Sequence, residues 1–119
     1  MNRRTGIAAL AAPAFWLCLT GAVTLALLPH PPELRELGDK AQHMLAFGTL
    51  AFLGALAFPR FPKSRLAERL SFLGALVEVL QAIPGLHRDC DIRDWIADTI
   101  AIVAVLVLLH ALNLLRRKR

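Results

Sequence analysis

Two polar side chains interrupt an apolar stretch near the middle of the sequence. Glu78 and Gln81 lie three residues apart within residues 70–83, whose other members are mostly apolar. That spacing places both side chains on one face of a helix. An ionisable group inside a membrane helix costs about 2.5–3.5 kcal/mol on insertion scales and marks a functional position. Glu78 is therefore the first candidate for acid/base chemistry.

A histidine upstream supplies a second candidate acid or base. Asp39 precedes His43 by four residues, so on a helix the carboxylate lies one turn from the imidazole. Such a neighbour fixes the tautomer of a histidine and raises its basicity, as proton transfer at a positioned group requires. We predict Glu78 and His43 as catalytic residues. The predicted ligand-binding residues are Asp39, Lys40, Gln81, Arg88, Asp91, Asp94 and Asp98.

Several of these candidates have simpler structural explanations. Asp91 and Asp94 precede or begin an apolar run, where an aspartate caps a helix and favours its dipole. Asp98 lies deeper in the run, and capping explains it less well. Arg88 offers a planar fork that suits phosphate or carboxylate groups. The spacing of the remaining histidines implies no metal ligation: His30, His87 and His110. The sequence leaves open which metal or cofactor, if any, is bound.

The composition is that of a membrane protein. Of 119 residues, 56% are hydrophobic, whereas soluble domains contain about 45–50%. The formal charge is +5, but the basic residues gather at the ends of apolar segments rather than in a stripe with aromatic side chains. We therefore expect no nucleic-acid partner. We expect residues 1–119 to form a single membrane domain.

Four apolar segments predict an all-α bundle of four transmembrane helices. The predicted spans are about 6–28, 41–58, 66–84 and 92–115. The first contains no charged residue, and at about 1.5 Å per residue it exceeds a hydrocarbon core of about 30 Å. A signal peptide is the alternative for this segment, but its apolar region is usually shorter, about 7–15 residues. Prolines stop the second and third spans, because proline lacks an amide donor: Pro59, Pro62 and Pro84.

The distribution of basic residues predicts the orientation. Lysines and arginines are concentrated near residues 3–4, 60–69 and 116–119, whereas the two other loops are more acidic. By the positive-inside rule, both termini and the middle loop are cytoplasmic. The polar candidates then converge in the outer half of the helices at 41–58, 66–84 and 92–115. We expect a multi-pass protein of the bacterial inner membrane, with the lipid bilayer as a partner and a polar pocket open to the outside.

Three linked blocks of residues resemble the VanZ-like family of small bacterial integral membrane proteins. The blocks are Asp39-Lys40-x-x-His43-x-x-x-Phe47, Glu78-x-x-Gln81 and Arg88-x-x-Asp91-x-x-Asp94-x-x-x-Asp98-Thr99. The resemblance covers residues 39 to about 101, roughly half of the chain. It implies a role at the cell envelope that is related to resistance to the glycopeptide teicoplanin.

Two positions depart from the pattern of this family. Asp98 stands where asparagine is usual, and Ala101 stands where glycine is usual. The additional carboxylate increases the negative charge of the pocket, so a cation, a proton or Arg88 would have to compensate it. The alanine loosens close helix packing slightly, since small residues let backbones approach.

Three hypotheses about function follow. In the first, the pocket binds a lipid-linked or cell-wall ligand without catalysis. In the second, Glu78 and His43 act as acid and base, with Asp94 and Asp98 orienting them or binding a metal, in a hydrolase or transferase for a lipid-linked group. In the third, the ionisable residues relay protons in a small transporter, which would have to be a homo-oligomer because four helices make a thin wall. The sequence does not decide whether the protein is an enzyme.

Overall fold

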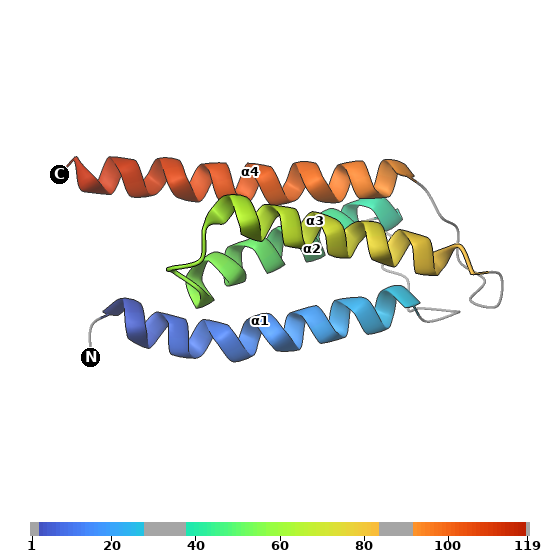
Figure 1. The fold of residues 1–119 in the computed structure, drawn as a ribbon, viewed down its shortest axis with the longest axis horizontal. Coiled ribbons are helices and arrows are strands. Elements are labelled where there is room, and N and C mark those ends of the chain that lie inside the picture. Colours follow the sequence, from blue (N-terminus) through green and yellow to red (C-terminus); the bar gives the residue numbers. More distant parts are fainter. Residues whose placement is uncertain (1–2, 28–37, 84–91, 119) are drawn as a thin grey trace.

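The computed structural model describes residues 3–27, 38–83 and 92–118, and of residues 3–4 and 38–40 it describes the backbone only. These residues form an all-α fold of four helices, elongated with dimensions of 52 × 27 × 25 Å (Figure 1). The helices are α1 Arg3–Leu27, α2 Gly38–Ala57, α3 Lys63–Gln81 and α4 Ile92–Arg117. The predicted number and order of helices are confirmed for the described part of the chain.

The turn between α2 and α3 is shorter than predicted. Pro62 occupies the N-cap position of α3 in an extended conformation, with φ −60° and ψ 135°. A proline there loses no helical hydrogen bond, because the first amides of a helix have no intrahelical acceptor. Helix α3 therefore begins at Lys63 rather than near residue 66. At its other end α3 stops at Gln81, before the predicted boundary at Pro84, with Ala82 capping the last turn.

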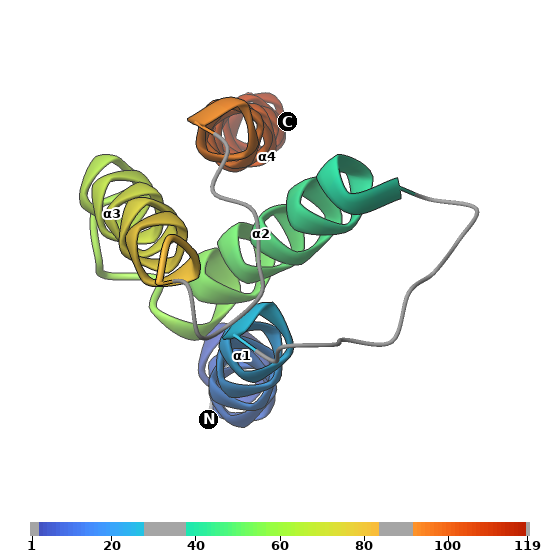
Figure 2. The same ribbon diagram turned by 90° about the vertical axis from the view of Figure 1, so that its right-hand side faces the viewer.

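The helices alternate in direction, so each end of the bundle gathers a different set of helix ends. Both termini and the α2–α3 turn lie toward one end of the long axis (Figure 1). The end of α1, the start of α2, the end of α3 and the start of α4 lie toward the other. Helix α2 packs against both α1 and α4, and α3 packs against α4 (Figure 2). We call the second end the polar end, because it carries the buried polar residues described below.

An apolar core joins all four helices. Leu50 of α2 and Ile102 of α4 are fully buried at its centre. From α1, Phe15 packs its ring edge against Phe58, with 5.4 Å between the ring centroids. This packing ties α1 to the rest of the described fold.

The outer surface of the bundle is strongly apolar. Leu10 and Leu17 of α1, Phe72 of α3 and Leu108 of α4 all expose more than half of their side chains. Soluble monomers seldom expose apolar patches of more than a few hundred Å². Two helical segments are long and apolar enough to cross a membrane, Thr5–Leu27 and Ile92–Arg117, and only 11% and 22% of their most apolar windows are buried. Core helices of soluble proteins are mostly buried, so these segments fit a lipid-facing surface better.

The two inner helices are less clearly membrane spans. The apolar part of α2, Ala41–Ala57, is shorter than a typical span. Helix α3 carries charged residues in its first two turns: Lys63, Arg65, Glu68 and Arg69. The structure thus supports two membrane-spanning helices by length and composition.

A glycine of α2 allows three helices to meet closely. A Cβ atom at Gly54 would lie 3.1 Å from Leu66 Cδ1 of α3 and 3.2 Å from Phe15 Cε2 of α1. We expect Gly54→Val to lower the free energy of unfolding by about 1–3 kcal/mol, because the added methyl groups overpack this contact. The measurement is unfolding of the purified protein in mixed detergent micelles.

The matched control is Gly21→Val in α1, where no atom of another described segment lies within 4 Å of an added Cβ. This change should alter stability by about 0.5 kcal/mol or less, since it only exchanges two residues of similar helix propensity. Equal effects of the two substitutions would contradict the packing of α1, α2 and α3 around Gly54.

Candidate functional site

Five polar side chains are buried in the half of the bundle toward the polar end. His43 comes from α2, Glu78 and Gln81 come from α3, and Asp94 and Asp98 come from α4. Each exposes 9% of its surface or less. All five are among the residues that the sequence predicts as the site. We call this set the polar centre.

Helix periodicity explains how the sequence directs these side chains inward. The buried face of α3 contains Leu70, Gly74 and Val77 together with Glu78 and Gln81. Its opposite face exposes Phe72, Leu76 and Val79. Residues three and four apart share a helix face, so the same rotation of α3 that exposes its large apolar residues buries Glu78 and Gln81.

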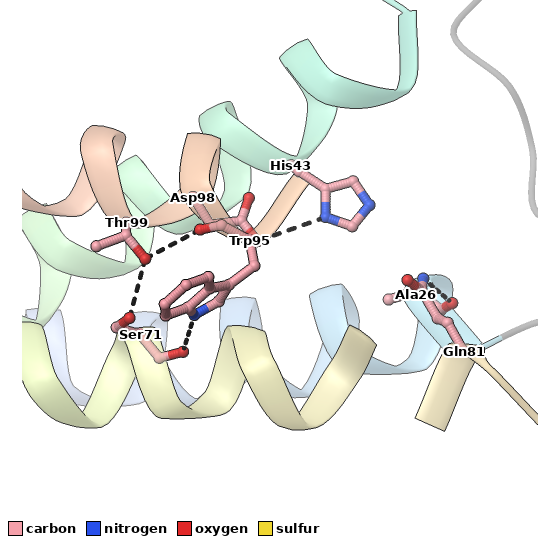
Figure 3. A network of polar contacts seen from close by, with 7 residues as sticks. All are labelled: Ala26, His43, Ser71, Gln81, Trp95, Asp98 and Thr99. Carbon is pink, nitrogen blue, oxygen red and sulfur yellow. Dashed lines mark hydrogen bonds and ion pairs between the residues drawn. The ribbon is translucent and has the colours of Figure 1, made fainter. Parts of the chain in front are cut away.

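The histidine of the polar centre lies beside an aspartate from another helix. His43 Nδ1 is 3.7 Å from Asp98 Oδ2, and both side chains are buried (Figure 3). The sequence predicts Asp39 as the carboxylate that orients His43, but the side chain of Asp39 lies outside the described residues. The described neighbour of His43 is Asp98, the aspartate that departs from the VanZ-like pattern, and the predicted role of Asp39 stays a prediction.

Three potential donor groups converge from three helices. One atom from each of His43, Glu78 and Asp94 lies within 4.8 Å of the others. The set combines an imidazole nitrogen with two carboxylate oxygens. Such a group can share protons among its members or bind a cation. Asp94 also lies in the first turn of α4, so its contribution to the helix dipole and its place in the polar centre are compatible.

The carboxylate of Asp98 carries a buried oxygen without a hydrogen bond in the described part of the chain. Asp98 is 1% exposed, and its Oδ1 has no hydrogen-bond partner among the described residues. An unsatisfied buried acceptor costs about 1–3 kcal/mol of stability, and a charged acceptor costs more. Such groups are rare in folded proteins and often mark a functional position or a bound ion. Gly74 brings α3 close to this carboxylate, since a Cβ at Gly74 would lie 3.4 Å from Asp98 Oδ2.

A network of hydrogen bonds holds α3 and α4 together beside Asp98. Trp95 Nε1 donates to the backbone oxygen of Ser71 at 3.0 Å, and the hydroxyls of Ser71 and Thr99 lie 2.9 Å apart. Thr99 also donates to the backbone oxygen of Trp95 at 2.9 Å (Figure 3). The sequence does not predict Ser71 as part of this region, because an isolated serine in an apolar helix gives no signal of its partner.

Gln81 connects the polar centre to α1. Its Nε2 donates to the backbone oxygen of Ala26 at 2.8 Å (Figure 3). Ala26 lies in the last turn of α1, where backbone carbonyls have no intrahelical donor. Gln81 therefore fixes the end of α1 against α3, and its predicted role in ligand binding stays a prediction.

The remaining predicted site residues cannot be placed at the polar centre. Arg88 and Asp91 lie outside the described residues. Asp39 and Lys40 belong to the first turn of α2, but their side chains are outside the described part of the structure. Their predicted roles in ligand binding remain predictions.

Comparison with known proteins adds no assignment: no family model, curated protein or solved structure matches the chain. The resemblance to the VanZ-like family therefore rests on the sequence blocks alone.

The hydroxyl pair between α3 and α4 can be tested by a double-mutant cycle. We expect Ser71→Ala and Thr99→Val to show a coupling free energy of about 0.6 kcal/mol, the average found for hydrogen bonds between membrane helices. Unfolding of both single variants and the double variant in micelles gives this value. Strict additivity of the two changes would show that the hydroxyls do not interact.

Proposed function

We propose that this chain is a VanZ-like protein of the bacterial inner membrane, and that its polar centre binds a lipid-linked or cell-wall ligand from the outer side. The observation that carries the proposal is the burial of His43, Glu78, Asp94 and Asp98 together. Four ionisable groups in the interior of so small a bundle are costly for stability. Their retention is best explained by function.

The proposal takes all four helices to cross the bilayer, with the polar end outward. Helix α2 has 20 residues and α3 has 19, so each is about 30 Å long at the rise of an α-helix. The charges of α3 lie in its first two turns, where long basic side chains can reach the headgroups. The outward face of α3 beyond these turns is apolar, as expected for contact with lipid.

The arrangement of charges supports this orientation. Arg60 of the α2–α3 turn, Lys63 and Arg65 of α3, and Arg116 and Arg117 of α4 belong to the end that carries the termini. The positive-inside rule makes that end cytoplasmic. The polar centre then lies in the outer half of the membrane.

A second candidate function is a hydrolase or transferase for a lipid-linked group. The convergence of His43, Glu78 and Asp94 within 4.8 Å favours it, because acid/base or metal-assisted catalysis needs such groups in mutual reach. Binding and catalysis would use the same polar centre, and the isosteric variant Glu78→Gln separates them. In an enzyme this change should abolish turnover while the substrate still binds, whereas in a binding site it should weaken the binding of the ligand itself.

The test of the proposal is the teicoplanin susceptibility of a sensitive bacterial host. We expect the wild-type protein to raise the minimal inhibitory concentration relative to an empty vector, and Glu78→Gln to remove most of this protection. Membrane levels of both proteins are matched by immunoblot. His110→Gln, an exposed position of α4 remote from the polar centre, is the control that should protect like wild type.

Each outcome has a distinct meaning. Protection by wild type and by His110→Gln but not by Glu78→Gln would support a role of the polar centre in the cell envelope. Absence of protection by the wild-type protein would contradict the resistance-related function. Equal protection by wild type and Glu78→Gln would place the function outside the polar centre.

A further inference from the structure

We propose that His43, Glu78 and Asp94 bind one divalent metal ion, Zn²⁺ or Mn²⁺, and that Asp98 positions His43 from the second shell of this site. The inference deepens the proposed function, since it rests on the same polar centre and names the cation that would occupy it.

The geometry of the three donors is close to that of a metal site. Their ligand atoms lie within 4.8 Å of one another. Around an ion with bonds of about 2.0–2.2 Å, two ligand atoms lie about 3–4 Å apart. Binding of an ion would draw the donors closer by about 1 Å. Because the donors come from α2, α3 and α4, the ion would join three helices at one point.

The charges of the polar centre also favour a cation. The buried ionisable side chains among the described residues are three carboxylates and one imidazole: Glu78, Asp94, Asp98 and His43. Carboxylates brought together away from water raise the free energy of the folded state unless protons or cations compensate their charge. A divalent ion would compensate two of the negative charges and would also satisfy carboxylate lone pairs.

Asp98 has the position of a residue that orients a metal-binding histidine. Its Oδ2 lies 3.7 Å from His43 Nδ1. Metal-binding histidines commonly donate their second ring N–H to a carboxylate, which fixes the tautomer and the ring orientation. A small approach of the two side chains would form this bond and leave Nε2 for the ion. The Oδ1 of Asp98 is buried and has no hydrogen-bond partner among the described residues. The positive charge of the nearby ion would then stabilise the Asp98 carboxylate.

The donor types narrow the choice of metal. Imidazole suits Zn²⁺ and other transition metals, whereas carboxylates suit Mn²⁺, Mg²⁺ and Ca²⁺. A set with one nitrogen and two carboxylates is therefore matched best by Zn²⁺ or Mn²⁺. The thiol of Cys18 is on α1 and packs against the apolar core, so it adds no soft ligand to this set.

The experiment measures metal content of the full-length protein, purified in detergent with a tag free of histidine. The protein is stripped with a chelator, incubated with Zn²⁺ or Mn²⁺, and freed of unbound metal before elemental analysis. We expect about one ion per chain for wild type and for His110→Gln, and a loss of at least about tenfold in bound metal for His43→Gln and Asp94→Asn. Asp98→Asn should keep the stoichiometry but weaken the affinity about 10–100-fold.

Two results would overturn the metal site. One is wild-type protein that binds no more metal than His43→Gln. The other is thermal unfolding of wild type that does not shift upward when Zn²⁺ or Mn²⁺ is added, since a ligand of the folded state must stabilise it. The second measurement needs no variant, so it decides the question even where a substitution prevents folding.

This experiment is independent of the susceptibility test. Metal binding by a protein that gives no protection would retain the metal site and reject the resistance-related function. Protection by a protein that binds no metal would reject the metal site alone. An intermediate affinity of Asp98→Asn, between those of wild type and His43→Gln, distinguishes a positioning role from a direct ligand.

Discussion

Replacing Leu17 with arginine is expected to prevent stable insertion of α1. Leu17 lies in the middle of the apolar segment Thr5–Leu27 and exposes 75% of its surface. In lipid this position faces hydrocarbon, where an arginine costs about 2.5–3.5 kcal/mol on insertion scales. If this surface of α1 faced water instead of lipid, the same change would be harmless or would improve solubility. We therefore expect the Leu17→Arg protein to be depleted from membranes at least about tenfold, as measured by immunoblot after carbonate extraction.

The matched control moves the new charge to a helix end. Leu115 is 61% exposed and precedes Arg116 and Arg117 in the last turn of α4. An arginine there can extend to the headgroups, so Leu115→Arg should accumulate in membranes like wild type. Normal accumulation of Leu17→Arg as a soluble, folded protein would contradict a membrane-facing surface.

Replacing Leu50 with alanine is expected to cause the largest loss of stability. Leu50 is fully buried in the core that joins α1, α2, α3 and α4. Truncation of a buried leucine removes dispersion contacts and leaves a cavity that the surrounding helices only partly fill. We expect a decrease in the free energy of unfolding of about 2–5 kcal/mol, measured by denaturation of the purified protein in micelles.

Leu45 provides the control for this change, because it belongs to the same helix but is 61% exposed. Leu45→Ala should change the free energy of unfolding by about 0.5 kcal/mol or less. If both substitutions had the same effect, the rotation of α2 in the bundle would be wrong.

The helices of this protein are predictable from local sequence, but their exact ends are less so. The apolar run at 6–28 and the prolines Pro59 and Pro62 predict α1 and the turn after α2. The sequence predicts that α3 begins near residue 66, whereas the helix begins at Lys63, directly after the N-cap residue Pro62. The charged residues that follow are compatible with the first turns of a helix. Whether α2 and α3 cross a membrane is not determined by their local sequence, because the apolar part of α2 is short and α3 begins with charged residues.

The polar centre is predictable in its members and less so in its contacts. Glu78 stands out because it is ionisable within an apolar run, and the structure buries it as expected. The approach of Asp98 to His43 depends on helix rotation and on the crossing of α2 and α4, so the sequence favours Asp39, four residues from His43, and gives no sign of Asp98. The bond from Trp95 to the backbone of Ser71 depends on the same geometry, since a backbone acceptor leaves no trace in residue type.

In the proposed function, the polar centre lies at the outer side of a four-span bundle. Labelling of single cysteines with a membrane-impermeant maleimide tests it most directly, after removal of the native thiols by Cys18→Ala and Cys90→Ser. Ile83→Cys lies just beyond α3 at the polar end, and Arg60→Cys lies in the α2–α3 turn; both positions are exposed.

We predict that intact cells label Ile83→Cys, and that Arg60→Cys reacts only after the membrane is permeabilised. The reverse pattern, or labelling of both cysteines in intact cells, would contradict an outward polar centre.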